Sequence, residues 1–108
     1  MGMVKQYDIY WVNLDPTVGS EIKKTRPCLV ISPNFSNKIL NTILVAPITS
    51  AVRNFPMRLS ITLKNKPAQV ALDQIRCVDT GRLFDKMASL DQKSVQKLKS
   101  LLSEYLVE

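Results

Sequence analysis

Histidine is absent from this chain of 108 residues. Without it, a Ser-His-Asp triad, a ribonuclease mechanism built on two histidines and a histidine-ligated metal site are all excluded. Cysteine is scarce: the two thiols, Cys28 and Cys77, have no third ligand with which to build a structural zinc site. Both stand in apolar, strand-like runs, so we expect buried free thiols rather than a disulfide.

Long apolar runs are also lacking, and none approaches the roughly 20 residues that a membrane-spanning helix needs. The N-terminus has no apolar segment typical of a signal peptide. Met1-Gly2 is followed by Gln6 where a myristoylation signal requires Ser or Thr. We therefore expect a cytoplasmic protein that does not associate with membranes.

The remaining composition is that of an ordinary globular domain, with 45% apolar and 22% charged residues. The length fits one domain over residues 1–108, with a single modest core. Fifteen Lys and Arg against nine Asp and Glu give a net charge of +6. This charge favours a polyanionic partner such as nucleic acid or an acidic protein, although a basic surface that only aids solubility fits equally well.

Aromatic and β-branched runs between turn signals predict five to seven short strands. The clearest is Met57–Leu63, which alternates strictly between apolar and polar residues, and the polar residues 64–67 after it predict a turn. Residues 27–32 are apolar on both faces, which indicates a central strand. The expected strands are residues 7–14, 27–32, 42–48, 57–63, 68–72, 75–78 and 83–87.

The C-terminal segment changes to a helical period. Ser89 and Gln92 have the spacing of a capping box, and Asp91 is a competing N-cap. We interpret the apolar stripe of this helix as core or as a dimer contact, not as a surface that reads nucleic acid. The stripe comprises Val95, Leu98, Leu101, Leu102, Tyr105 and Leu106.

Short strands closed by one helix predict a mainly β fold with a C-terminal helix, as a small, partly open β-barrel. The polar segment Asp15–Thr25 is the expected rim of a binding groove. It ends at Arg26-Pro27, where Pro27 fixes its own φ and biases Arg26 toward an extended conformation. Because Arg26 stands where a loop stiffens into a strand, we expect it at the centre of the function.

Four runs occur in a fixed order: Asp15–Glu21, Thr25–Val30 with its Arg-Pro pair, Val45–Ser50 and Asp73–Asp79. Together they resemble the MazF/PemK family of toxin endoribonucleases, over nearly the whole chain. The resemblance implies an SH3-like barrel of the CcdB/MazF type that forms a homodimer and needs no metal or cofactor. It also implies sequence-specific cleavage of single-stranded RNA to 2′,3′-cyclic phosphate and 5′-hydroxyl ends, and neutralisation by an acidic antitoxin protein.

The resemblance assigns catalytic roles to two residues. Arg26 matches the family's catalytic Arg, and its planar fork suits two contacts with phosphate oxygens. We expect Arg26 to stabilise transition-state charge rather than act as the base, because guanidinium has a pKa above about 12. Thr49 matches the family's catalytic Thr, whose hydroxyl could donate to a phosphate oxygen; alternatively, it caps backbone groups at a strand end.

The general base is left open between Glu21 and Asp73, both of which lie in matched runs. A carboxylate beside Arg26 would have a lowered pKa, and Glu21 would serve equally well to orient Arg26. One branch of the family has an Arg two residues before the Asp73 position, where this chain has Ala71. The candidates for a replacement cation are Arg53, Arg76 and Arg82.

Further residues are expected to bind RNA. Gln74 could read a base edge or be a satisfied core amide, and Trp11 and Tyr10 could stack on bases or belong to the core. Lys23, Lys24 and Arg58 are expected to contact phosphates. Besides Arg58, the expected RNA-binding residues are Gly19, Ser20, Lys23, Lys24, Ser50, Arg53, Gln74 and Arg76.

Two alternatives to the ribonuclease are open. One is a non-enzymatic toxin similar to CcdB, which binds a protein target such as gyrase through a C-terminal Trp-Gly-Ile tail. This chain ends in Tyr105-Leu106-Val107-Glu108 and has Arg26 and Thr49, so this alternative ranks second. The other is a nucleic-acid-binding barrel without catalytic activity.

Overall fold

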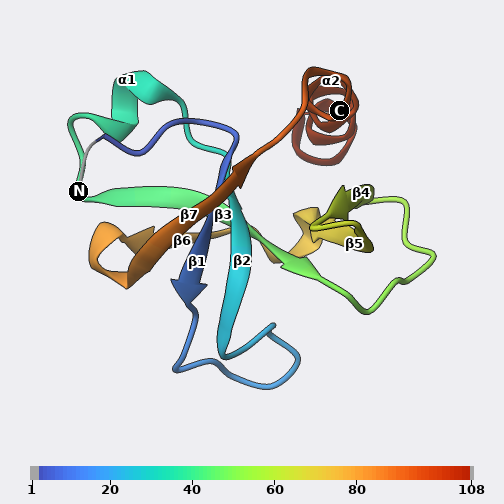
Figure 1. Ribbon diagram of the computed structural model, residues 1–108, viewed down its shortest axis with the longest axis horizontal. Coiled ribbons are helices and arrows are strands. Elements are labelled where there is room, and N and C mark those ends of the chain that lie inside the picture. Colours follow the sequence, from blue (N-terminus) through green and yellow to red (C-terminus); the bar gives the residue numbers. More distant parts are fainter. Residues whose placement is uncertain (1–2, 108) are drawn as a thin grey trace.

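The computed structural model describes residues 3–107, which fold into an antiparallel sheet and a C-terminal helix (Figure 1). Short 3₁₀ turns at Leu72–Gln74 and Thr80–Arg82 link strands, and a π-helical turn at Ser103–Val107 extends the last helix. The main elements are β1 (Asp8–Asn13), β2 (Thr25–Val30), α1 (Asn34–Asn37), β3 (Thr42–Thr49), β4 (Arg58–Leu63), β5 (Lys66–Ala71), β6 (Arg76–Asp79), β7 (Leu83–Ser89) and α2 (Gln92–Leu102).

Strand β3 organises the sheet, whose order is β4-β5-β3-β2-β1-β7. One edge of β3 pairs with β2. Along the other edge, the last residues of β3 pair with β5 and its first residues pair with β6. The sheet curls so that the β4–β5 hairpin lies on one side of Figure 1 and β7 crosses β1 on the other. With β4 and β7 at the two ends of this order, the barrel is partly open, as predicted.

Strand β2 is central, as predicted, because it pairs with both β1 and β3. Its residues alternate between two buried clusters, as the period of a strand requires. Cys28 and Val30 belong to one cluster with Tyr10 and Val12, whereas Leu29 belongs to another that Ile9, Ile48, Val70 and Leu98 complete. Both faces of β2 are therefore covered, and the end that carries Arg26 is held by a rigid support.

Helix α2 has one of the two expected residues as its N-cap. The Asp91 carboxylate accepts a hydrogen bond from the Ser94 N–H at 3.1 Å, so Asp91 is the N-cap. The first part of the predicted stripe is core, since Val95 and Leu98 are buried. Its end is open to solvent, with Tyr105 46% and Leu106 62% exposed.

Two details differ from the expectation. The turn between β4 and β5 is tighter than residues 64–67: Lys64 and Asn65 both have positive φ, of 52° and 65°, and β5 begins at Lys66. The pair of left-handed residues is the geometry of a two-residue hairpin turn. The loop expected after β2 contains the short helix α1, where the Asn37 amide donates to the Ser32 carbonyl at 2.9 Å and accepts from its hydroxyl at 2.6 Å.

The expectation of two buried thiols is confirmed for Cys28 and wrong for Cys77, which is exposed. Successive residues of a strand point to opposite faces. On β6, Val78 points into the core, so Cys77 points outward beside its exposed partner on β3, Leu44. Neither helix within residues 3–107 combines the length and the apolar character that crossing a membrane requires.

Candidate active site

Arg26 is the second residue of β2, opposite Val12 of β1. Its side chain is half-buried, and its Nε donates to the Lys23 carbonyl at 3.1 Å. Within residues 3–107 no ion pair joins Arg26 to a carboxylate. The Glu21 carboxylate instead accepts from the Val18 N–H at 2.5 Å, within its own loop. The guanidinium of Arg26 is therefore oriented by backbone, and its terminal nitrogens are available to a ligand.

Thr49 is the last residue of β3. Its Oγ1 accepts from the Ala51 N–H at 3.1 Å, so the hydroxyl does cap a backbone group, as the alternative reading expected. A hydroxyl that accepts still has its own proton to donate. Since Cys28 lies opposite Pro47, continuing this antiparallel register by two residues brings Arg26 and Thr49 to neighbouring strand ends.

Arg26, Thr49 and Ser50 line one open cavity of about 260 Å³. Its wall also contains Trp11, which is 38% exposed, so this aromatic side chain is not core. The tip of the β4–β5 hairpin adds Lys64 and Lys66, which the sequence argument did not single out. The sequence marks them only as residues at a turn, and their place at the cavity follows from the pairing of β5 with the end of β3.

A second cavity, of about 320 Å³, collects most of the other expected site residues. Because Pro47 lines it and Ile48 lines the first, the two cavities border the same end of β3. The site residues therefore divide into a strand-end group around Arg26 and a loop group. The loop group is Ser20, Glu21, Asp73, Gln74 and Arg76.

Asp73 is paired with Arg58. Its two carboxylate oxygens accept from Nε at 2.6 Å and from Nη2 at 3.0 Å, and the side chains of Arg58 and Asp73 are only 8% and 22% exposed. The hydrogen bonds from Arg58 hold the pKa of Asp73 below its usual range. The Arg58 guanidinium also lies 5.1 Å from the ring centre of Phe55. The cation beside Asp73 is thus Arg58, rather than Arg53, Arg76 or Arg82.

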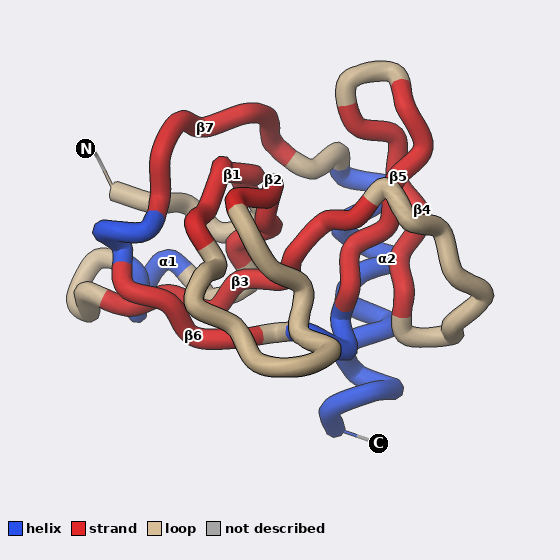
Figure 2. The backbone as a smooth tube through the Cα atoms, turned by 90° about the horizontal axis from the view of Figure 1, so that it is seen from below, coloured by secondary structure: helices blue, strands red, loops and turns tan. Residues whose placement is uncertain are grey.

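Figure 2 shows the long backbone path of the loop between β1 and β2. Hydrogen bonds from side chains of the segment that follows β5 hold this loop. The Gln74 amide accepts from the Ile22 N–H at 3.0 Å and donates to the Ser20 carbonyl at 3.3 Å. Arg76 donates to the Leu14 carbonyl at 3.0 Å. Arg82 donates in the same way to the carbonyls of Asn13, at 3.1 Å, and Asp15, at 2.5 Å.

The remaining expected RNA-binding residues lie on exposed loops. Gly19 and Lys24 have positive φ, of 59° and 71°, and the Lys24 N–H donates to Asp15 Oδ1 at 3.0 Å. Lys23 and Arg53 are exposed.

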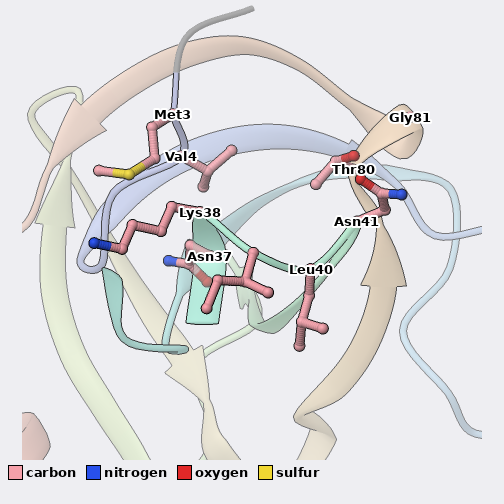
Figure 3. Close-up of a pocket in the computed structure, with 9 residues that line it drawn as sticks. Met3, Val4, Asn37, Lys38, Leu40, Asn41, Thr80 and Gly81 are labelled. Atoms are coloured by element: carbon pink, nitrogen blue, oxygen red, sulfur yellow. The ribbon is translucent and has the colours of Figure 1, made fainter. Parts of the chain in front are cut away.

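A separate cavity of about 380 Å³ lies between α1 and the turn at Thr80–Arg82 (Figure 3). Its wall has one charged side chain, Lys38, and none of the expected site residues.

Comparison with known proteins agrees with this geometry. Residues 5–106 match the family described as "PemK-like, MazF-like toxin of type II toxin-antitoxin system". The chain belongs to this family. Among curated relatives, endoribonuclease EndoA of Bacillus subtilis (strain 168) is 35% identical over 106 residues, which is 93% of this chain and 91% of EndoA. Endoribonuclease MazF of Staphylococcus saprophyticus is 27% identical, over 93% of this chain and 88% of that protein.

Solved structures of the PemK/MazF family have the same fold. MazF from Deinococcus radiodurans superposes with a TM-score of 0.86 at 22% identity, over 100% of both chains. An endoribonuclease from a mycobacterial species, solved in complex with its cognate antitoxin, superposes with a TM-score of 0.81 at 17% identity, over 95% of this chain and 94% of that one. The predicted fold class is thereby confirmed, and the family match does not favour the CcdB-like alternative.

Proposed function

We propose that this chain is a MazF-like endoribonuclease toxin that cleaves single-stranded RNA at specific sequences without a metal ion. The observation that carries this proposal is the open cavity that Arg26, Thr49 and Ser50 share with the exposed Trp11. It unites a phosphate-binding fork, hydroxyl donors and an aromatic surface, in a chain that is 35% identical to a protein named an endoribonuclease.

The reaction is an internal transesterification. The 2′-hydroxyl loses its proton, the bond from its oxygen to phosphorus forms, and the bond from phosphorus to O5′ breaks as O5′ gains a proton. The products are a 2′,3′-cyclic phosphate and a 5′-hydroxyl. Arg26 stabilises the charge on the non-bridging oxygens through its free terminal nitrogens, and the Thr49 hydroxyl donates to one of the same oxygens.

The two candidate bases are not equivalent. Asp73 engages both of its oxygens with Arg58, which holds its pKa low, so Asp73 is a poor proton acceptor at neutral pH. Its role in our proposal is to position the turn that carries Gln74. Glu21 is exposed, on the loop that leads to Arg26, and is the better candidate for the base.

RNA binding follows from the distribution of charge around the cavity. Lys64 and Lys66 contact phosphates on the hairpin side, and Trp11 stacks on a base. Of the residues expected from the sequence, Ser50 contacts RNA beside Arg26, and Ser20 and Arg76 do so in the second cavity. Gly19, Lys23, Lys24 and Arg53 contact RNA from the exposed loops. The Gln74 amide is engaged by the loop backbone at both ends, so we assign it no RNA contact. Because phosphate contacts release counterions, RNA affinity falls steeply with added salt.

Two protein partners complete the proposal. A chain of net charge +6 suits an acidic antitoxin, and the mycobacterial relative of the same fold was solved with its cognate antitoxin. The second partner is another copy of this chain. The exposed end of the α2 stripe, Tyr105 and Leu106, is apolar and forms the contact between the two copies.

The test is cleavage of a mixed single-stranded RNA by the purified protein in excess EDTA, with the new ends mapped. The expected products carry 2′,3′-cyclic phosphates at a defined sequence, and they disappear with Arg26→Ala. Lys97→Ala, which removes one charge from the exposed face of α2, is the matched control and retains activity. RNA that stays intact at high protein concentration would refute the proposed endoribonuclease activity.

A further inference from the structure

Gln69 is a buried polar residue that the function described above does not use. It lies on β5 directly opposite Thr49 and is only 4% exposed. Its Oε1 accepts from the Arg53 N–H at 2.9 Å, and its Nε2 donates to the Arg53 carbonyl at 2.9 Å. One side-chain amide thus pairs with both polar groups of one backbone residue, as a neighbouring strand would.

Near Arg53, the segment that Gln69 contacts is fixed mainly by this amide, whereas its far end is held at Phe55, whose carbonyl accepts from the Arg58 N–H at 3.1 Å. Residues 51–56, between Ser50 and Met57, are all exposed, so burial of apolar side chains does little to fix their conformation. The same segment contains Ala51, whose N–H orients the Thr49 hydroxyl. A shift of the backbone at Arg53 therefore displaces Ala51, two residues earlier, and with it the N–H that orients the Thr49 hydroxyl.

Gln74 makes the same kind of contact on the other side of the site. Its amide accepts from the Ile22 N–H and donates to the Ser20 carbonyl, more than 50 positions away in sequence. The loop that it holds carries Glu21 and leads to Lys23, whose carbonyl accepts from Arg26 Nε. One loop follows Thr49 and the other leads to Arg26, and each is thus held at its backbone by one glutamine amide.

We propose that Gln69 and Gln74 are positioning residues of the ribonuclease, each holding one active-site loop in the conformation that cleavage requires. Gln69 acts through the Thr49 hydroxyl, and Gln74 acts through the loop that orients Arg26. Their value lies in geometry rather than in contact with RNA, since both ends of each amide are engaged by backbone. This inference rests on the proposed ribonuclease function.

The experiment compares Gln69→Met and Gln74→Met with the matched control Gln96→Met, on the exposed face of α2. Methionine keeps the length of the side chain and removes both hydrogen-bonding groups. Amide hydrogen exchange reports on the loops, and cleavage of the RNA at saturating and limiting concentrations separates kcat from KM. Because Gln74 is only half-buried, its variant tests the proposal even where Gln69→Met does not fold.

We expect exchange at the Arg53 N–H to accelerate in Gln69→Met and exchange at the Ile22 N–H to accelerate in Gln74→Met. In each variant kcat falls about tenfold or more, because misplacing a reacting group by about 1 Å costs up to about 100-fold. KM changes much less, and Gln96→Met matches the wild type in all readouts.

Three results would overturn the inference: unchanged exchange at both loops, faster exchange with unaltered kcat, or a rise in KM alone, which would make Gln74 an RNA contact. Absence of cleavage by the wild type would overturn the proposed function. That outcome is distinguishable, because the exchange measurements are made without RNA.

Discussion

At the scale of single residues, the site depends on how backbone orients two side chains. Arg26 donates from Nε to a loop carbonyl and keeps its outer nitrogens for a ligand. Thr49 accepts from the Ala51 N–H and keeps its proton for donation. Both side chains therefore reach the cavity already oriented, which in the proposed reaction would lower the entropic cost of the transition state.

Removing the Thr49 hydroxyl tests its role as a donor. Thr49→Val keeps the shape of the side chain, and we expect kcat to fall by roughly 100-fold, the effect of losing one donor to transition-state charge. Thr49→Ser restores the hydroxyl and much of the activity. Thr62→Val, on the exposed face of β4, is the control for the loss of a threonine hydroxyl. A Thr49→Val enzyme as active as the control would contradict the assignment.

The two thiols are expected to differ in reactivity. Burial raises the pKa of Cys28 to about 12, so this thiol stays protonated and inaccessible at pH 8, whereas Cys77 is exposed. A maleimide reagent should add one label to the native protein, at Cys77, and two after denaturation. Peptide mapping by mass spectrometry identifies the labelled residue, and rapid native labelling of Cys28 would be inconsistent with its burial.

Motifs pointed to Arg26 and Thr49, which line one cavity, because the proposed chemistry depends on residue type at a fixed place along the chain. They could not predict Lys64, Lys66 or Gln69. The lysines reach the cavity only because the β4–β5 hairpin folds over the end of β3, and Gln69 gains its role from pairing with Thr49. These are consequences of strand register, which the local sequence does not encode.

At the scale of elements, the ion pair between Arg58 and Asp73 joins β4 to the turn after β5. Because Arg58 lowers the pKa of Asp73, this carboxylate stabilises the fold at pH values above about 4, its ordinary pKa, and loses that contribution as the pH falls through the lowered value. Asp73→Asn should therefore cost about 2 kcal/mol at pH 7 and less at acid pH.

Urea denaturation of the wild type and Asp73→Asn at pH 7 and at acid pH measures this difference directly. Subtracting the two free energies of unfolding at each pH cancels the titration of the other carboxylates. A difference that is the same at both pH values would show that the ion pair does not titrate as its geometry requires.

The hairpin turn offers a test by stabilisation. Lys64 and Asn65 both adopt positive φ, and glycine is preferred at the second position of such a turn. Asn65→Gly should raise the free energy of unfolding by about 0.5 to 1 kcal/mol in thermal or urea denaturation, because the relief of left-handed strain exceeds the entropic cost of a glycine. Asn54→Gly, at an exposed position without positive φ, should not stabilise the protein. Equal effects at the two positions would contradict the turn assignment.

The strands could be predicted from alternation and turn residues, because each is bounded by its own local signals. The helix α1 could not. Its four residues depend on Asn37, whose side chain bonds to Ser32 at the end of the preceding strand. The expected N-cap choice for α2 was open for a similar reason, since Ser89 uses its hydroxyl on the Asp8 carboxylate.

At the scale of the whole molecule, a partly open barrel could be predicted from several short strands and one amphipathic helix. The order of the strands could not be predicted, because β3 pairs not only with β2, the strand before it, but also with β5 and β6, which come later in the chain. Membership of the PemK-like, MazF-like family accounts for this arrangement. The same curled sheet brings the loops after β1 and β3 to one edge.

The homodimer is tested at this scale. Leu106→Asp places a charge on the exposed end of the α2 stripe and should shift the protein from dimer to monomer in light scattering after gel filtration. Lys93→Asp, on the polar face of the same helix, should leave the dimer intact. A wild type that is monomeric at high concentration would contradict the proposed contact between copies.

In the proposed reaction, RNA bound in the cavity at Arg26 and Thr49 is cleaved by attack of its own 2′-hydroxyl. The most direct measurement uses two RNA oligonucleotides that contain the mapped cut site and differ by one 2′-deoxy substitution at the attacking nucleotide, both in excess EDTA. We expect the unmodified RNA to be cut to a 2′,3′-cyclic phosphate and the deoxy RNA to be bound but not cut at that bond. Cleavage of the deoxy RNA at the same bond would show that the 2′-hydroxyl is not the nucleophile.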